Sequence, residues 1–290
     1  MNYTGNKYKL LPKLYQSFPK DIECFLDLFC GGCDVCTNYS SSNLQKVYAN
    51  DINYHVIEIY QCLQSITQYD FEHGIDIIMY HLNARIRQYE LSKTNEEGFK
   101  AFRNEYNNSN MPVPLDLFLL MCYSFNNQMR FNNKHKYNSS FGRNRSEFNN
   151  NIKDNLIKFT EAIGNIEFFK QDFKDFDYSL LDNYSNCFVY ADPPYSLGCA
   201  TYNDGRRGFK GWHSSDDIML FGILDGLSSK DIKFALSNVI EHKGQTNELL
   251  VNWVKANDYN LVPINYNYDN CNYQAKNKNY TTKEVLITNY

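Results

Sequence analysis

The sequence predicts an α/β protein with a mainly parallel sheet and a long helical insertion. Apolar runs at 25–29, 47–49 and 187–191 are each followed within two positions by glycine or an acidic residue, as buried strands of such a sheet often are. Residues 53–124 carry apolar side chains at helical spacing and show no strand pattern. Strands that alternate with helices form a parallel sheet, so the insertion separates two parts of one α/β unit.

Length and composition fit one large domain with an insert, or two small domains. The chain has 290 residues, of which 43% are hydrophobic. No apolar run approaches the ~18 residues of a transmembrane helix. The first residues lack the apolar core of a signal peptide, so we expect a cytoplasmic protein whose nine cysteines are mostly reduced. The net charge of −4 argues against a global basic field but leaves room for a local basic groove.

The first strand runs into a glycine turn. A polar glycine turn at Tyr3–Lys7 opens the chain before a predicted helix, and the strand at 25–29 leads into Gly31-Gly32 and a helix candidate. Such a turn lets the backbone approach a nucleoside closely. Asp51 ends the next strand about 20 residues on, where an acid typically binds ribose hydroxyls. Together they indicate an adenosine-containing cofactor, although a plain strand–turn–helix explains the turn alone equally well.

Three cysteines in this turn suggest an alternative, a metal site. Cys30, Cys33 and Cys36 have a spacing that occurs in iron–sulfur proteins. Cys30 directly follows a core strand, and the other two fall on the first turns of the expected helix. Small buried residues suit those positions. We therefore expect no metal.

The segment 125–158 is locally basic. It holds seven basic and two acidic residues, a balance of +5 in a chain of net −4. Arginine, asparagine and glutamine read base edges, lysine and arginine meet phosphates, and an exposed phenylalanine can enter a base step. The pattern predicts a nucleic-acid-reading hairpin, and a solvated hairpin is the alternative.

The α/β alternation then resumes up to the most informative stretch. A strand at 166–169 is followed by Asp172, a candidate partner for a cofactor base. The strand at 187–191 ends in Asp192-Pro193-Pro194-Tyr195, at the strand end where open α/β sheets bind ligands. A carboxylate, a carbonyl and an aromatic ring together suit a flat exocyclic amino group, held by two acceptors while the ring stacks on it. In isolation, a proline-rich turn is the simpler interpretation.

The remaining elements complete the sheet. Residues 196–213 form a polar loop next to the presumed site, and a helix begins at Ser214. A strand at 233–238 and a helix at 249–254 follow. Strands at 261–264 and 285–287 predict an antiparallel edge.

These motifs, in this order, resemble the Dam-type DNA adenine methyltransferases. The resemblance covers nearly the whole chain and is greatest to the T-even-phage branch. Several motifs in register make it specific, whereas D-P-P-Y alone is not. The motifs are Tyr3–Lys7, Asp27–Gly32, Asp51, Tyr89–Thr94, Arg130–Asn132, Phe141-Gly142, Asp192–Tyr195 and Leu236–His242.

The resemblance implies a Rossmann-like, S-adenosylmethionine-dependent methyltransferase sheet with an inserted, mostly helical target-recognition domain that carries a β-hairpin. Residues 1–55 with 158–290 would bind the cofactor S-adenosyl-L-methionine, and residues 56–157 would recognise DNA. The implied reaction is adenine-N6 methylation of a flipped base in duplex DNA, with GATC as the leading target, in a phage or bacterial host cell. We expect no membrane partner, and a monomer or a weak dimer on DNA.

Residue roles carry over motif by motif. Asp192, Pro193 and Tyr195 should grip the target adenine. Lys7 should position the Asp192 region. The expected cofactor-binding residues are Tyr3, Lys7, Phe29, Gly31, Gly32, Asp51, Asp172, Phe173 and Asp192. The expected DNA-binding residues are Phe125, Asn126, Gln128, Arg130, Asn132, Ser140 and Arg143.

Departures from the family pattern keep alternatives open. Cys33 replaces a frequent glycine, while Gln128 and Ser140 replace an apolar residue and a proline in the hairpin. An N4-cytosine methyltransferase would use the same amine chemistry. A methyltransferase that acts on an RNA adenine or a protein amide is a second alternative. A non-catalytic DNA-binding relative is the alternative from another class, and the intact Gly31, Asp51, Asp192 and Tyr195 argue against it.

Overall fold

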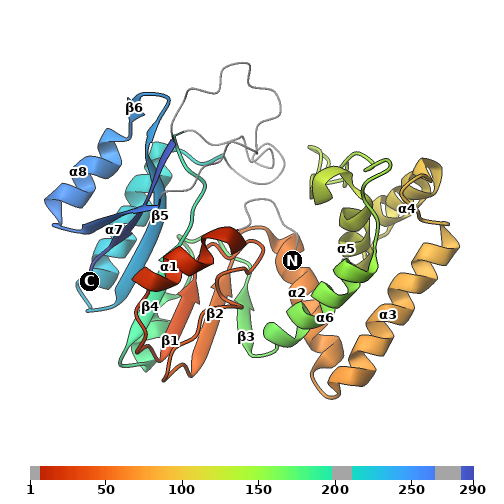
Figure 1. Ribbon diagram of the computed structural model, residues 1–290, viewed down its shortest axis with the longest axis horizontal. Helices are drawn as coiled ribbons and strands as arrows, with labels where there is room; N and C mark the ends of the chain where they lie inside the picture. Colours follow the sequence, from red (N-terminus) through yellow and green to blue (C-terminus); the bar gives the residue numbers. More distant parts are fainter. Residues whose placement is uncertain (1–6, 198–210, 265–281) are drawn as a thin grey trace.

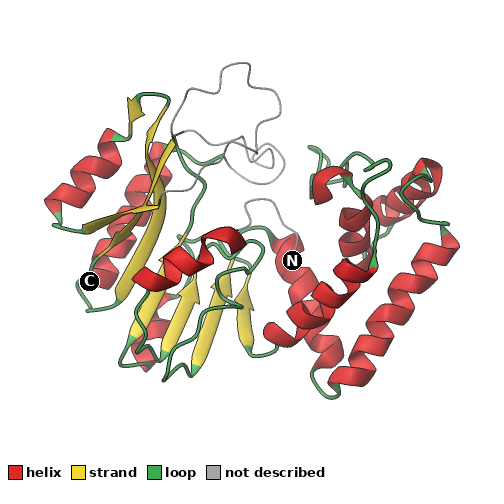
Figure 2. Ribbon diagram, viewed as in Figure 1, coloured by secondary structure: helices red, strands yellow, loops and turns green. Residues whose placement is uncertain are grey.

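The computed structural model describes residues 7–197, 211–264 and 282–290. A single mostly parallel sheet with helices on both faces forms one part of the molecule, and helices α2 to α6 gather beside it (Figures 1 and 2). This architecture confirms the predicted α/β fold class. Within these ranges no helix is both long and apolar enough to cross a membrane.

The described strands lie in the order β3-β2-β1-β4-β5-β8-β7, and the two-residue β6 pairs with β5. The pairs among β3, β2, β1, β4 and β5 are parallel, whereas β8 is antiparallel to both β5 and β7. The expected antiparallel edge is therefore present. The bounds are β1 (Cys24–Asp27), β2 (Lys46–Asn50), β3 (Ile166–Phe169), β4 (Cys187–Ala191), β5 (Lys233–His242), β6 (Gln245–Thr246), β7 (Asn260–Ile264) and β8 (Thr282–Thr288).

Alternating side chains of the central strands bury both faces of the sheet. Phe25 and Phe188 face one side, where α1 packs, and Leu26 and Val189 face the other, where α7 and α8 pack. Because both faces are covered, the central strand β4 is apolar and buried along its whole length. The elements that flank the sheet are η1 (Tyr8–Leu10), α1 (Leu11–Ser17), η3 (Tyr178–Asn183), α7 (Ser214–Ser228) and α8 (Glu248–Ala256).

The insertion between β2 and β3 is helical, as predicted. Side-chain oxygens of Asp70, Asn95 and Asn149 accept a backbone N–H in the first turns of α3, α4 and α6, which satisfies donors that a helix start leaves unpaired. Helix α5 is buried along its whole length. The bounds are α2 (Tyr54–Thr67), α3 (Phe71–Gln88), α4 (Glu96–Asn108), α5 (Pro114–Tyr123), η2 (Phe125–Asn127) and α6 (Asn150–Ala162).

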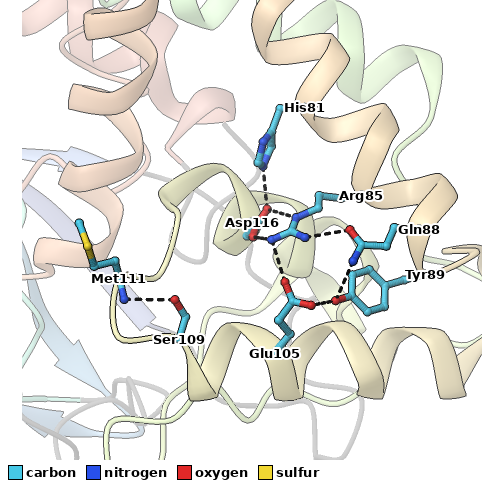
Figure 3. Close-up of polar contacts among 8 residues, drawn as sticks. All are labelled: His81, Arg85, Gln88, Tyr89, Glu105, Ser109, Met111 and Asp116. Carbon is cyan, nitrogen blue, oxygen red and sulfur yellow. Dashed lines mark hydrogen bonds and ion pairs between the residues drawn. The ribbon is translucent and has the colours of Figure 1, made fainter.

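A buried carboxylate ties three of these helices together (Figure 3). Asp116 on α5 is 3% exposed, and its two oxygens lie 2.7 Å from His81 Nε2 and from one terminal nitrogen of Arg85, both on α3. That same nitrogen lies 3.0 Å from Glu105 of α4. Burial would raise the pKa of Asp116, but its bonds to His81 and Arg85 hold that pKa below its ordinary value. Asp116 is therefore a charged centre of the helical part.

The structure corrects one sequence expectation and refines two. The residues after Gly31-Gly32 form successive turns rather than a helix, because Gly31 and Cys33 both have positive φ, 44° and 59°. The hairpin expected in the segment 125–158 is held by two isolated antiparallel bridges, Ser124 to Phe141 and Phe131 to Tyr137, not by a regular ladder. The sheet contains β6 in addition to the seven expected strands.

The domain boundaries expected after residues 55 and 157 fall inside α2 and α6. Gln61 and Gln64 of α2 donate hydrogen bonds of 3.1 and 2.8 Å to the carbonyls of Phe168 and Ile166 on β3. Helix α2 therefore packs on the sheet that it was expected to leave, and the division into two domains stays a prediction.

Candidate active site

The segment Asp192–Tyr195 lies at the carboxyl end of β4, between neighbouring parallel strands β1 and β5. Lys7, just before η1, reaches it: its Nζ lies 3.1 Å from Asp192 Oδ1 and 2.8 Å from the Tyr195 hydroxyl. That hydroxyl also lies 2.9 Å from Asp192 Oδ1. The structure thus brings together three predicted residues that are 188 positions apart at most.

The same cluster contains a second carboxylate. Glu284 on β8 is 3% exposed, and its Oε1 lies 2.9 Å from Lys7 Nζ and 2.8 Å from the Tyr195 hydroxyl. Burial lowers the pKa of Lys7, but Asp192, the tyrosines and Glu284 outweigh it, so the net pKa is raised and Lys7 is charged. One ammonium group therefore pairs with two carboxylates, the buried Glu284 and the half-buried Asp192.

Asp27, at the end of β1, adds a third acidic group on the next strand. It is 1% exposed, and its Oδ2 accepts a hydrogen bond of 3.2 Å from the backbone N–H of Cys36. Burial, then the charge of Asp192, raises the pKa of Asp27 to about 8. The neutral form of Asp27 avoids a further negative charge beside Asp192 at neutral pH.

The glycine turn and Asp51 meet, as predicted. Asp51 Oδ2 accepts from the Gly31 N–H at 2.9 Å, and its Oδ1 accepts from the Asn53 N–H at 2.8 Å. Tyr60 of α2 donates to the Gly31 carbonyl at 2.8 Å. Two backbone donors thus fix the carboxylate, and each oxygen keeps acceptor capacity for a ligand.

Three aromatic rings line the neighbouring strand ends. The ring centres of Phe29 and Phe173 are 5.5 Å apart, and Trp212 lies 5.7 and 5.3 Å from them. Phe29 and Trp212 are half-buried, which leaves part of each ring accessible. Flat apolar rings suit the base of a nucleoside, and the Asp51 carboxylate, which two backbone N–H groups hold, suits its ribose. The residues present therefore fit an adenosine-containing cofactor.

The other expected cofactor-binding residues have fewer contacts with the groups described above. Asp172 is half-buried, and its Oδ1 accepts from the backbone N–H of Lys174 at 3.1 Å. Gly32 is buried in the turn, and Tyr3 lies outside the described residues. Within the described ranges no group of three or more His, Cys, Asp or Glu residues is arranged to hold a metal ion.

The expected DNA-binding residues lie in or beside the hairpin. Phe125 is 42% exposed beneath the guanidinium of Arg145, 5.1 Å from its ring centre, and Asn126 has a positive φ of 54°. Arg130 is half-buried, and no described residue accepts a hydrogen bond from its buried Nε. Asn126 and Phe125 are therefore presented outward, whereas Arg130 has a buried donor without a partner.

The remaining hairpin residues have structural contacts. Asn132 Oδ1 accepts from the N–H groups of Lys134 and Lys136 at 2.9 and 3.1 Å, so it closes the turn. Gln128 is half-buried, and its carbonyl accepts from Ser139. Ser140 is exposed with its carbonyl bonded to the Phe125 N–H at 2.8 Å, and Arg143 pairs with Glu96.

Sequence reasoning missed Glu284 as a site residue. It stands at the start of the apolar run Val285–Ile287, so local pattern places it at a strand end on the surface. The one hint in the sequence was that Glu284 is an acidic residue directly before an apolar, strand-like run. Trp212 falls in the segment 196–213, which the sequence predicts only as a polar loop, and its packing on Phe29 and Phe173 depends on tertiary contacts.

The geometry defines a class first. Phe29, Asp51 and Phe173 follow β1, β2 and β3, the Trp212 ring packs on both phenylalanines, and a carboxylate with a tyrosine follows β4. This arrangement at the carboxyl ends of parallel strands is typical of an α/β methyltransferase-type protein. A family model described as D12 class N6 adenine-specific DNA methyltransferase matches residues 3–270. The chain belongs to this family, whose adenine-N6 methyltransferases use S-adenosylmethionine as methyl donor.

Named relatives agree with the family. The chain is 44% identical over its full length to the Type II methyltransferase M.FokI of Planomicrobium okeanokoites, and 41% to the modification methylase StsI of Streptococcus sanguinis. It spans 42% of the length of each of these two proteins. It is also 25% identical to the DNA adenine methylase of Escherichia coli (strain K12), over 82% of this chain and 79% of that protein.

Proposed function

We propose that the chain transfers a methyl group from S-adenosylmethionine to N6 of an adenine that is flipped out of duplex DNA. The observation that carries the proposal is the cluster at the end of β4, where Lys7 and Tyr195 hold the Asp192 carboxylate beside two prolines. Pro193 and Pro194 supply no N–H donor, so acceptors dominate the segment. A primary amino group complements it.

The residues of the chain act by holding the amine. Asp192 and the Pro193 carbonyl accept its two N–H groups, and the Tyr195 ring stacks on the base. Both acceptors withdraw the N–H groups from the ring plane, which directs the nitrogen lone pair toward the cofactor pocket. Positioning of this kind supplies most of the acceleration. Stacking also offsets the few kcal/mol that base flipping costs.

The cofactor pocket would be formed by Phe29, Phe173 and Trp212 around the base, and by Asp51 at the ribose. Gly31 has a positive φ and no Cβ, so its backbone can lie against the ligand. When bound, S-adenosylmethionine supplies an electrophilic methyl group. The charged Lys7 would act on the amine side of the site by positioning the Asp192 region, and its contacts to Asp192 and Tyr195 support this role.

The hairpin would provide the DNA contacts. Phe125 and Asn126 would enter the stack at the flipped nucleotide, and Arg130 would contact a base. The buried Nε of Arg130 has no hydrogen-bond partner among the described residues, which supports this assignment, because a buried donor gains free energy when it finds an acceptor. The finer resemblance, to the T-even-phage branch with its GATC target, forms part of the same proposal.

The test measures transfer of labelled methyl to a GATC duplex and to the same duplex with its adenine replaced. Label on the first alone supports adenine methylation within GATC. Label on both duplexes discards GATC and calls for a panel of other sequences, with Gln128 and Ser140 as the residues to examine. Label on a cytosine amine contradicts the adenine assignment, and cofactor binding without transfer to any DNA favours a non-catalytic relative or another substrate.

Replacing Arg130 by alanine is expected to relax sequence preference. Loss of one direct base contact costs about 1–3 kcal/mol of discrimination, a factor of about 5–150. The measurement is the ratio of kcat/KM between the preferred duplex and a single-base mismatch. Lys153→Ala serves as control, since it also removes one cation from the basic segment. A mismatch ratio that equals the wild-type ratio would remove Arg130 from base reading.

A further inference from the structure

Glu284 lies in the interior of the sheet end that carries the site. Its backbone pairs with Val239 on β5 and with Ile264 on β7, and its side chain is 2% exposed. An ionised carboxylate this deeply buried is costly unless a charge and hydrogen bonds compensate it. Lys7 and the Tyr195 hydroxyl supply both, at 2.9 and 2.8 Å. Glu284 is thus built into the same cluster as Asp192.

The Tyr195 hydroxyl decides how the two carboxylates share hydrogen bonds. It lies 2.9 Å from Asp192 Oδ1 and 2.8 Å from Glu284 Oε1, but a phenol has one proton to donate. Lys7 donates to the phenol oxygen and cannot replace that proton. If Tyr195 donates to Glu284, Asp192 Oδ1 keeps a free acceptor position for another donor. If Tyr195 donates to Asp192, that position is filled.

We propose that Glu284 is a positioning residue that accepts the hydrogen bond of the Tyr195 hydroxyl and shares Lys7, which leaves Asp192 free to accept from the target amino group. The inference rests on the proposed function, because it concerns how the same site prepares its acceptor. Glu284 does not touch the substrate and acts through Tyr195 and Lys7. Without it, both donors turn to Asp192 Oδ1 and fill its acceptor positions, which makes the carboxylate a weaker acceptor for the amine.

The charges around Asp192 determine in which direction its pKa changes when the charge of Glu284 is removed. Asp192 faces Lys7 before η1, Tyr195 in its own segment, Tyr190 on β4, Asp27 on β1 and Glu284 on β8. Burial raises the pKa of Asp192, Glu284 raises it further, and Lys7 opposes both. Removal of the Glu284 charge therefore lowers the pKa of Asp192. The ionised form then persists to lower pH, but as a weaker hydrogen-bond acceptor.

The experiment compares Glu284→Gln with wild type, since glutamine keeps the shape and removes the charge. In single-turnover methyl transfer on duplex DNA we expect the rate on the high-pH plateau to fall about tenfold. The acid limb should move about 0.5–1 pH unit downward, while cofactor affinity stays unchanged. Glu241→Gln is the matched control, because Glu241 pairs with the exposed Lys283 on the neighbouring strand and should behave as wild type.

A second readout does not depend on activity. Carboxyl NMR titration, with the Asp192 signal assigned by its loss in Asp192→Asn, should show a lower Asp192 pKa in Glu284→Gln than in wild type. A wild type inactive on every duplex refutes the proposed function, yet this titration still tests the inference. An Asp192 pKa that is unchanged or raised overturns it, as does a rate loss without a shift of the acid limb. A Glu284→Gln protein that does not fold assigns Glu284 to stability instead.

Discussion

Asp192→Ala is expected to reduce methyl transfer by at least about 10³-fold, which corresponds to about 4 kcal/mol of transition-state stabilisation. The carboxylate is the only charged acceptor in the Asp192–Tyr195 segment. Its loss also leaves Lys7 with Glu284 as its remaining acidic partner within the described cluster, so the local charge becomes more positive. A positive neighbour opposes an amine that gains positive character during transfer.

The readouts are single-turnover transfer of labelled methyl, cofactor affinity and DNA affinity. DNA affinity should change little, because Asp192 acts on the amine rather than on the duplex as a whole. Cofactor affinity tests separately whether Asp192 also contacts S-adenosylmethionine. Asp182→Asn is the control: Asp182 pairs with Lys230 on the surface, and both side chains are about half exposed. Activity of Asp192→Ala within tenfold of wild type would show that another group grips the amine.

Asp116→Ala is expected to destabilise the helical part of the chain by about 3 kcal/mol. Removal of one partner from a buried ion pair costs about 3–5 kcal/mol, because the remaining charge is left unpaired. Arg85 is 20% exposed, so water compensates part of the loss and the lower figure applies. His81 and Arg85 on α3 would both lose their contact with α5 (Figure 3).

Hydrogen exchange of the α3 and α5 amides measures this effect locally, where a single melting curve of a chain with an insertion would mix several transitions. Glu97→Gln is the control, because Glu97 is 86% exposed and pairs only with Lys100 in the described structure. The folded pKa of Asp116 is lowered, so its contribution is present above the unfolded pKa and is lost as pH falls through the folded pKa. Protection that remains at the wild-type level in Asp116→Ala would contradict the role of this cluster.

The sequence alone predicted the fold class and the helical insertion, which the structure confirms, and it named Lys7, Asp192 and Tyr195, which the structure brings together. Strand and helix periodicity is local, so apolar runs and i, i+3, i+4 spacing suffice to place most elements. Asp51 and Asp192 were recognisable because each ends a strand, and the carboxyl ends of parallel strands meet at one sheet edge. The motif order gave the family, which the comparison over residues 3–270 confirms.

The turn after Gly31-Gly32 was misjudged because helical spacing does not reveal positive φ at Cys33. Only the tertiary structure showed that Glu284 and Trp212 contact the predicted site residues. Glu284 stands 277 residues from Lys7, and Trp212 lies 183 residues beyond Phe29, so no local pattern relates them. Their contacts depend on the antiparallel placement of β8 next to β5 and on the packing of Trp212 against Phe29, just beyond the end of β1. Such long-range contacts depend on the order of the strands in the sheet and on which side chains are buried. Local patterns in the amino-acid sequence do not determine either of these.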